Sequence, residues 1–166
     1  MGVGYYKAIT QWSKGEYSGA NNTQDDFMVI GLNSAGPRTD EPSSELQSAS
    51  PTSGVISSAT DIDEFSLTVA DGQTATIVAM AAPTSPDLDI VLSLSGPDGF
   101  ITSNDPGSGS SSGDVATGMN ASIAEVPAGT YTIRVDGAGF ASPLNPGYSD
   151  YASVGGYTVA ITTTTA

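Results

Sequence analysis

Carboxylates are the side chains of this sequence whose types and spacing are suited to chemistry. Asp61 and Asp63 flank Ile62 at the start of an expected strand, and Asp40 and Glu41 stand together in a stretch rich in Ser and Pro. Carboxylate oxygens bind hard cations such as calcium, which takes about six to eight oxygen ligands. The alternative is that Asp61 and Asp63 are turn residues at the end of a strand.

A second pair of carboxylates, Asp87 and Asp89, alternates around Leu88. On a strand both would face one side, as a second cation site or as the carboxylate pair of a glycosidase. The alternative is structural: Asp87 follows Pro86 as a turn residue, and Asp89 faces solvent or a tyrosine hydroxyl. We favour the structural roles, because nothing else in the sequence indicates a cleft.

Two tyrosines and an acid, Tyr148, Asp150 and Tyr151, precede the last expected strand. We interpret the tyrosines as corner packing, with their hydroxyls bonded to backbone or to an acid. Asp150 would hold the turn through an Asx-type bond. The functional alternative is ligand binding, in which these side chains form a platform for sugar rings or a peptide.

The composition excludes several classes of site. The chain has no cysteine and no histidine, so it can form neither a disulfide, nor a Ser-His-Asp triad, nor a zinc site of thiolates and imidazoles. Its net charge of −14 would repel nucleic acid and anionic membranes. No apolar run approaches the ~20 residues of a membrane span, and the first residues lack the apolar region of a signal peptide.

Three regions differ in character along the chain. In the first, residues 1–32, "NNTQDDFMVIGLN" indicates a short helix over residues 23–31, with Thr23 as its cap and Asp26 three positions on, as in a capping box. Residues 33–53 are rich in Ser, Pro and Gly and are typical of a linker. Residues 54–166 contain strand patterns separated by Gly and Pro, which predict an all-β, antiparallel β-sandwich of about seven or eight strands.

The strand patterns also predict which side chains point into the core. "TATIVAMAA", residues 74–82, is apolar on both faces, as in a central strand covered on each side. "LDIVLSLSGPDGFIT" reads as a hairpin, and "SNDPGSGSSSGD" as a mobile loop with little to bury. The expected inward residues are Phe65, Leu67, Val69, Ile90, Leu92, Leu94, Tyr131, Ile133, Val135, Tyr157, Val159 and Ile161.

Four segments in order resemble the bacterial pre-peptidase C-terminal domain: "ATDIDEFSLTVADGQTATIVA", "SPDLDIVLSLSGPDG", "VPAGTYTIRVDGAG" and "GYSDYASVGGYTVAI". The likeness covers roughly residues 38–163. It implies a jelly-roll-like β-sandwich that follows the catalytic domain of a secreted peptidase and is in some cases removed during maturation. Relatives in collagenases bind calcium and fibrous substrate. By this resemblance, Asp40, Glu41, Asp61 and Asp63 share one calcium ion.

The first thirty residues resemble the end of the catalytic domain in bacterial reprolysin-like zinc metallopeptidases. The resemblance implies that Met1-Gly2 is the methionine turn and that residues 23–31 are the final helix. The zinc-binding HExxH helix would lie upstream, so this chain would be the C-terminal piece of a larger, secreted enzyme and would hold no zinc itself. The aromatic residues Tyr5, Tyr6, Trp12 and Tyr17 would pack against the upstream catalytic domain.

These observations predict a non-catalytic accessory domain that aids secretion, folding or substrate attachment, with calcium as its expected cofactor. The alternative is a module that binds carbohydrate or fibrous protein. An independent hydrolase using Asp87 and Asp89 is the third and least favoured interpretation.

Overall fold

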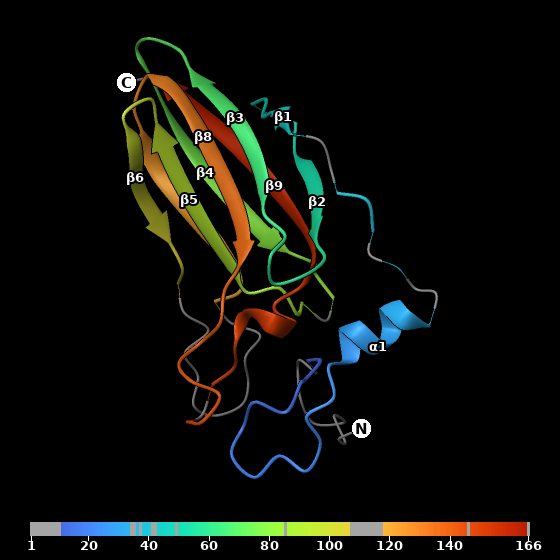
Figure 1. The fold of residues 1–166 in the computed structure, drawn as a ribbon. Coiled ribbons are helices and arrows are strands. Elements are labelled where there is room, and N and C mark those ends of the chain that lie inside the picture. The colour runs from blue at the N-terminus through green and yellow to red at the C-terminus, as the bar shows by residue number, and fades with distance from the viewer. Residues whose placement is uncertain are drawn as a thin grey trace.

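The protein is a sandwich of two β-sheets with a short helical segment at one end (Figure 1). The structure is a computed structural model, and it describes residues 11–33, 36, 38–40, 43–48, 50–84, 86–106, 118–145 and 147–165. The elements are α1 (Asp26–Leu32), β1 (Ser44–Glu45), β2 (Thr52–Ile56), β3 (Asp63–Val69), β4 (Gln73–Ala81), β5 (Ile90–Gly96), β6 (Gly99–Asn104), β7 (Ala121–Val126), β8 (Gly129–Gly137), the 3₁₀ helix η1 (Asp150–Ala152) and β9 (Gly155–Thr165).

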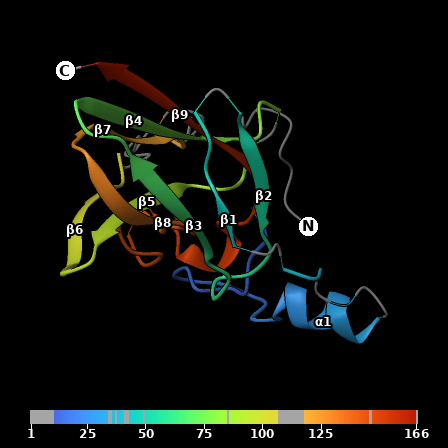
Figure 2. The ribbon, with the colours of Figure 1, turned by 90° about the horizontal axis from the view of Figure 1, so that it is seen from above.

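One sheet has the strand order β1-β3-β8-β5-β6 and the other the order β2-β9-β4-β7. From β3 to β5 and from β7 to β9 the chain crosses from one sheet to the other with each successive strand, so these neighbours in sequence face each other across the core (Figure 2). The pairings are antiparallel, apart from the short parallel contact of β1 with β3. The predicted antiparallel β-sandwich is confirmed.

Alternation along the strands builds the core. In β3 every second residue is buried, from Asp63 to Val69, and β8 and β9 show the same alternation in their central parts. Because successive side chains of a strand point to opposite faces, this pattern puts one face of each sheet against the other sheet. All twelve side chains predicted to point inward are buried: Phe65, Leu67, Val69, Ile90, Leu92, Leu94, Tyr131, Ile133, Val135, Tyr157, Val159 and Ile161.

The prediction for β4 was wrong in one respect. Its inward residues Ala75, Ile77 and Ala79 are buried, but Met80 on the other face is 43% exposed. This face is therefore not covered by another layer in the described part of the chain. On this open face Val78 is a β-branched residue that suits a central strand, paired here with β7 and β9.

The N-terminal boundaries also differ from the prediction. The helix begins at Asp26 rather than at residue 23, and its N-cap is Asp25, whose side chain accepts a hydrogen bond from the amide of Met28. The expected linker, residues 33–53, contains β1, and β2 begins before its end. Met1-Gly2, Tyr5, Tyr6 and residues 107–114 of the expected mobile loop lie outside the described residues.

No helix in the described residues is long and apolar enough to cross a membrane.

Candidate metal site and tyrosine corner

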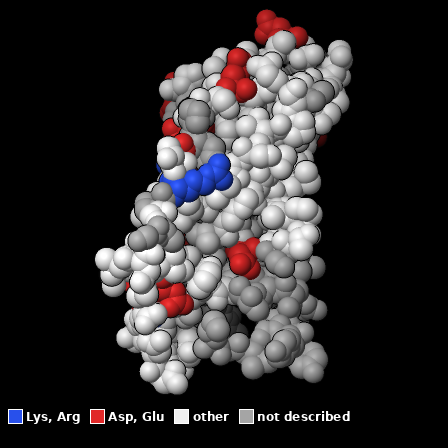
Figure 3. Space-filling model, turned by 90° about the vertical axis from the view of Figure 1, so that its right-hand side faces the viewer, with Lys and Arg blue, Asp and Glu red and all other residues white. Residues whose placement is uncertain are grey.

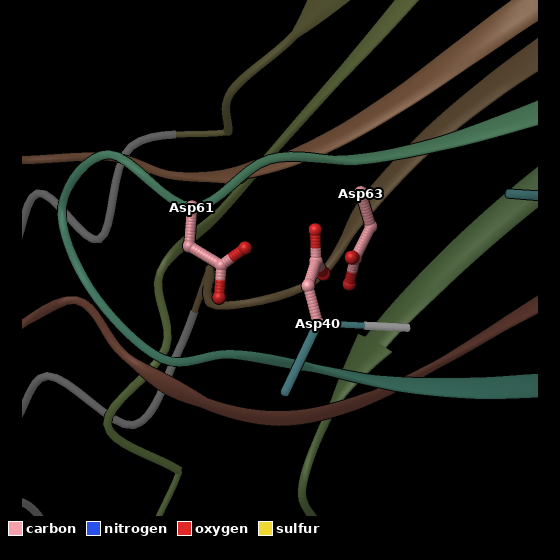
Figure 4. Close-up of side chains that lie close together, drawn as sticks. All are labelled: Asp40, Asp61 and Asp63. Carbon is pink, nitrogen blue, oxygen red and sulfur yellow. The ribbon is translucent and has the colours of Figure 1, made fainter. Parts of the chain in front are cut away.

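Three of the predicted cation ligands meet at one end of the sandwich (Figure 4). Asp40 lies in the segment before the sandwich, Asp61 in the connection from β2 to β3, and Asp63 is the first residue of β3. One carboxylate oxygen from each lies within 4.8 Å of the others. Figure 4 shows Asp40 between the other two side chains. The fourth predicted ligand, Glu41, lies outside the described residues.

Asp61 is held in place by its own loop. Its Oδ2 atom accepts hydrogen bonds from the backbone amide of Ser57 at 2.6 Å and from the Ser57 hydroxyl at 2.7 Å. These two bonds close the turn between β2 and β3. They fix the carboxylate at the end of the strand, so Asp61 fills both roles that the sequence left open: it is a turn residue and a member of the acidic cluster.

Asp63 is the buried member of the cluster, with 4% of its surface exposed. Its Oδ2 atom accepts a hydrogen bond of 2.5 Å from the hydroxyl of Tyr157. Its Oδ1 atom is buried and has no hydrogen-bond partner among the described residues. Burial, followed by the neighbouring charge of Asp61 and the contact with Asp40, raises the pKa of Asp63 to about 6.

A buried carboxylate oxygen without a partner is costly, because it has lost its hydration and gained nothing in return. Two further carboxylates beside it increase that cost by charge repulsion. A bound cation would remove both penalties. The donor set is made of carboxylate oxygens, which suits calcium or magnesium rather than a metal that prefers nitrogen or sulfur.

Acidic side chains are spread over the side of the molecule drawn in Figure 3, with uncharged surface and basic side-chain atoms between them. The three aspartates come together because Asp40, in the segment before the sandwich, lies beside the start of β3.

Asp89 and Asp87 have different environments. Asp89 is fully buried, and its Oδ2 atom accepts a hydrogen bond of 2.6 Å from the hydroxyl of Tyr148. This is one of the two structural roles expected from the sequence. Burial raises the pKa of Asp87, which is half-buried. In the described part of the chain, neither aspartate belongs to a cluster of three carboxylates that could hold a metal ion.

The two tyrosines of the corner bond to acids, as packing residues were expected to do. Tyr148 holds Asp89, whereas the hydroxyl of Tyr151 donates to Oδ1 of Asp25 at 2.8 Å and accepts from the amide of Phe27 at 3.1 Å. Asp150 is exposed, and its backbone carbonyl, not its carboxylate, accepts from the amide of Ser153. We find no Asx-type bond for Asp150 among the described residues.

Tyr151 is also the residue on which the N-terminal segment, residues 11–33, docks. Phe27 packs on its ring with centroids 4.8 Å apart, Trp12 packs on Phe27 at 5.9 Å, and the Lys14 ammonium lies 4.7 Å from the Tyr151 ring centre. Figure 1 shows this segment at the end of the sandwich where η1 lies. This contact could not be predicted from the sequence, because residues more than 120 positions apart in the chain carry no local signal of their pairing.

Replacing Tyr151 by Phe is expected to loosen the N-terminal segment while leaving the sandwich intact. The change removes one acceptor and one donor but keeps the ring, so the local cost is about 1 kcal/mol. Hydrogen exchange at the Phe27 amide would measure it, with an expected loss of protection of about fivefold. Tyr17→Phe is the control, because Tyr17 is 52% exposed. Unchanged protection at Phe27 would contradict the docking role.

Comparisons with known proteins give likenesses of fold. No model of a known protein family matches the chain, and no curated protein matches it. Among solved structures, it is similar to the pre-peptidase C-terminal domain of a collagenase from Bacillus anthracis, with a TM-score of 0.48 and 12% identity over 75% of this chain and 98% of that one.

It is also similar to PliG, a periplasmic inhibitor of g-type lysozyme. The Aeromonas hydrophila protein gives a TM-score of 0.44 and 16% identity over 74% of this chain and 96% of that one. The Salmonella Typhimurium protein gives a TM-score of 0.43 and 19% identity over 75% of this chain and 100% of that one.

Proposed function

We propose that this chain is a non-catalytic accessory domain of a secreted bacterial zinc metallopeptidase, and that calcium stabilises it. The observation that carries the calcium site is the meeting of Asp40 with Asp61 and Asp63, and the accessory role is what the sequence resemblance implies. The resemblance of the sequence to pre-peptidase C-terminal domains implies these three ligands together with Glu41. The upstream catalytic domain would supply the zinc and the peptidase activity, and this domain would aid secretion, folding or attachment to substrate.

A calcium ion at the cluster would tie the segment before the sandwich to the start of β3. The ion would use oxygens of Asp40, Asp61 and Asp63, and backbone carbonyls and water would complete its coordination. Because Asp40 is exposed and belongs to no strand, it is the ligand most free to move. Calcium would therefore hold a connecting segment in place beside the sandwich, which is a mechanical role suited to an accessory domain.

Isothermal titration calorimetry with calcium chloride tests the proposal. The protein, first freed of metal with a chelator, is expected to bind one ion with a dissociation constant of about 10⁻⁴ M, as extracellular modules do. Asp40→Asn should weaken binding at least about tenfold, since it removes one charged ligand. Asp98→Asn, an exposed acid in the turn between β5 and β6, is the matched control and should bind as the wild type does. No binding at about 1 mM calcium would overturn the cation site.

A second candidate function is a carbohydrate-binding module. The observation that favours it is a pocket beside the tyrosine corner, lined by Tyr148 and Tyr151 but not by Asp150.

A further inference from the structure

A pocket of about 240 Å³ lies between the N-terminal segment and the tyrosine corner, which is formed by Tyr148 and Tyr151. One wall comes from the N-terminal segment, including Trp12, Glu16 and Tyr17, and the other from the chain around the tyrosine corner. The pocket exists only because the N-terminal segment docks on Tyr151. It is smaller than the ~300–1,000 Å³ of sites for drug-sized ligands, so it would hold one ring of a ligand and not an extended molecule.

Two aromatic rings that line this pocket are partly exposed to solvent. Trp12 is 48% exposed and Tyr17 is 52% exposed, although both line the pocket. Because both rings line the pocket and stay about half in solvent, their apolar faces are open to a ligand that enters it. A rigid ring with an apolar face and a polar edge gives much contact area at little entropic cost, and it suits a ligand with the same amphipathic character.

A carboxylate in the same pocket is already held in position. Glu16 accepts a hydrogen bond from the hydroxyl of Ser149, and its other oxygen pairs with the Lys14 ammonium at 3.3 Å. Glu16 is therefore a fixed acceptor whose charge is balanced by Lys14. A pocket of this kind favours a neutral ligand that donates hydrogen bonds, and the net charge of −14 disfavours an anionic one.

From this combination we propose that the pocket binds one ring of a neutral saccharide. The apolar face of the sugar ring would lie against Trp12 or Tyr17, and its hydroxyls would donate to Glu16. The proposal deepens the binding-module function and does not require the cation site. Simple amines are the competing ligands, because aromatic rings beside a carboxylate also attract cations.

Trp12 is the only tryptophan in the chain, so its fluorescence reports on the pocket directly. The full chain would be titrated with cellotriose, triacetylchitotriose and maltotriose, once with chelator and once with calcium. We expect a saturable change with at least one trisaccharide, at a dissociation constant of about 1 mM or below. No saturable change with any of the three, or saturation by choline chloride alone, would overturn the proposal.

Variants of residues that line the pocket test whether the change in Trp12 fluorescence arises from binding there. Tyr17→Ala and Glu16→Gln should each weaken binding about tenfold. Phe100→Ala is the control: this ring is 70% exposed on β6, outside the pocket, and its loss should leave the affinity unchanged. Protection of the Phe27 amide shows whether each variant still has its N-terminal segment docked. Equal binding by the wild type and both docked pocket variants would overturn the proposal.

The two proposals fail separately in these experiments. Saccharide binding that persists with chelator, in a protein that binds no calcium, overturns the cation site alone. Calcium binding without saccharide binding overturns the pocket alone.

Discussion

Calcium at about 10 mM is expected to raise the melting temperature of this protein by about 5–10 °C near pH 7.5, and by much less near pH 5. The reason is the state of Asp63. Without a cation its pKa is about 6 in the folded protein against an ordinary value of 3.8, mainly because the carboxyl is buried. At about pH 5 a proton neutralises Asp63, and calcium must compete with that proton. At about pH 7.5 the proton is gone, so calcium relieves the full penalty.

The sign of the pH effect follows from the direction of the shift. A carboxyl whose pKa is raised on folding binds a proton more tightly in the folded state. Its contribution to the free energy of unfolding is therefore fully present below 3.8 and is lost as the pH rises through 6. The loss is on the order of 3 kcal/mol for a shift of this size. Burial also raises the pKa values of Asp87 and Asp136, which adds to the same trend.

The variant Asp63→Asn distinguishes the effect of calcium binding from the effect of the raised carboxyl pKa values on stability. Asn has the same shape and still offers Tyr157 an acceptor, but it carries no charge. Near pH 7.5 without calcium, the variant should be at least as stable as the wild type, and calcium should no longer raise its melting temperature. Asp71→Asn, an exposed acid in the turn after β3, is the control and should keep the calcium response. Thermal melts of the three proteins at the two pH values, with calcium and with chelator, measure the effect. An equal calcium response in Asp63→Asn would contradict the prediction.

The alternating strands could be predicted from the sequence because their period of two records burial directly. Phe65, Leu67 and Val69 alternate with polar residues, and the structure buries these three and exposes the residues between them. The β4 segment lacked this contrast, because Val78 and Met80 stand where the other strands have polar residues. An apolar residue on an open face looks the same in sequence as one under a second layer, so the pattern could not show which face was covered.

The members of the acidic cluster could be predicted from the sequence, but the hydrogen bonds that join distant residues could not. Asp61 and Asp63 are neighbours in sequence, and the family resemblance added Asp40. The bond of Asp63 to Tyr157 joins residues 94 positions apart, and no pattern in the chain indicates it. The helix cap shows the same limit: Thr23 and Asp25 both suit an N-cap locally, and in the structure Asp25 is the one that also bonds to Tyr151.

Gly54 is expected to be the least replaceable glycine near the cation site. It lies in β2 opposite Tyr157, and both residues face the core. A Cβ atom at position 54 would lie 2.3 Å from the Tyr157 hydroxyl and 2.8 Å from Oδ2 of Asp63. The hydroxyl cannot simply move aside, because Tyr157 is buried and its ring packs edge-on against Phe65 with centroids 6.4 Å apart. Gly54 thus makes the space in which Tyr157 reaches Asp63.

Gly54→Ala should therefore destabilise the protein by about 2–3 kcal/mol, from overpacking together with a disturbed hydrogen bond to a buried acid. The sign of the change in the free energy of unfolding tests the prediction, since Ala in a strand ordinarily stabilises a protein relative to Gly by about 0.5–1 kcal/mol. Gly156→Ala is the matched control in the neighbouring strand. Among the described residues its Cβ would have one neighbour within 4 Å, the Gly54 carbonyl oxygen at 4.0 Å, so the variant should be neutral or slightly stabilised. Urea unfolding measures both, and a Gly54→Ala protein as stable as Gly156→Ala would show that Tyr157 does not need this space. The variant should also lose calcium affinity, because the bond that orients Asp63 is the one that the new methyl group displaces.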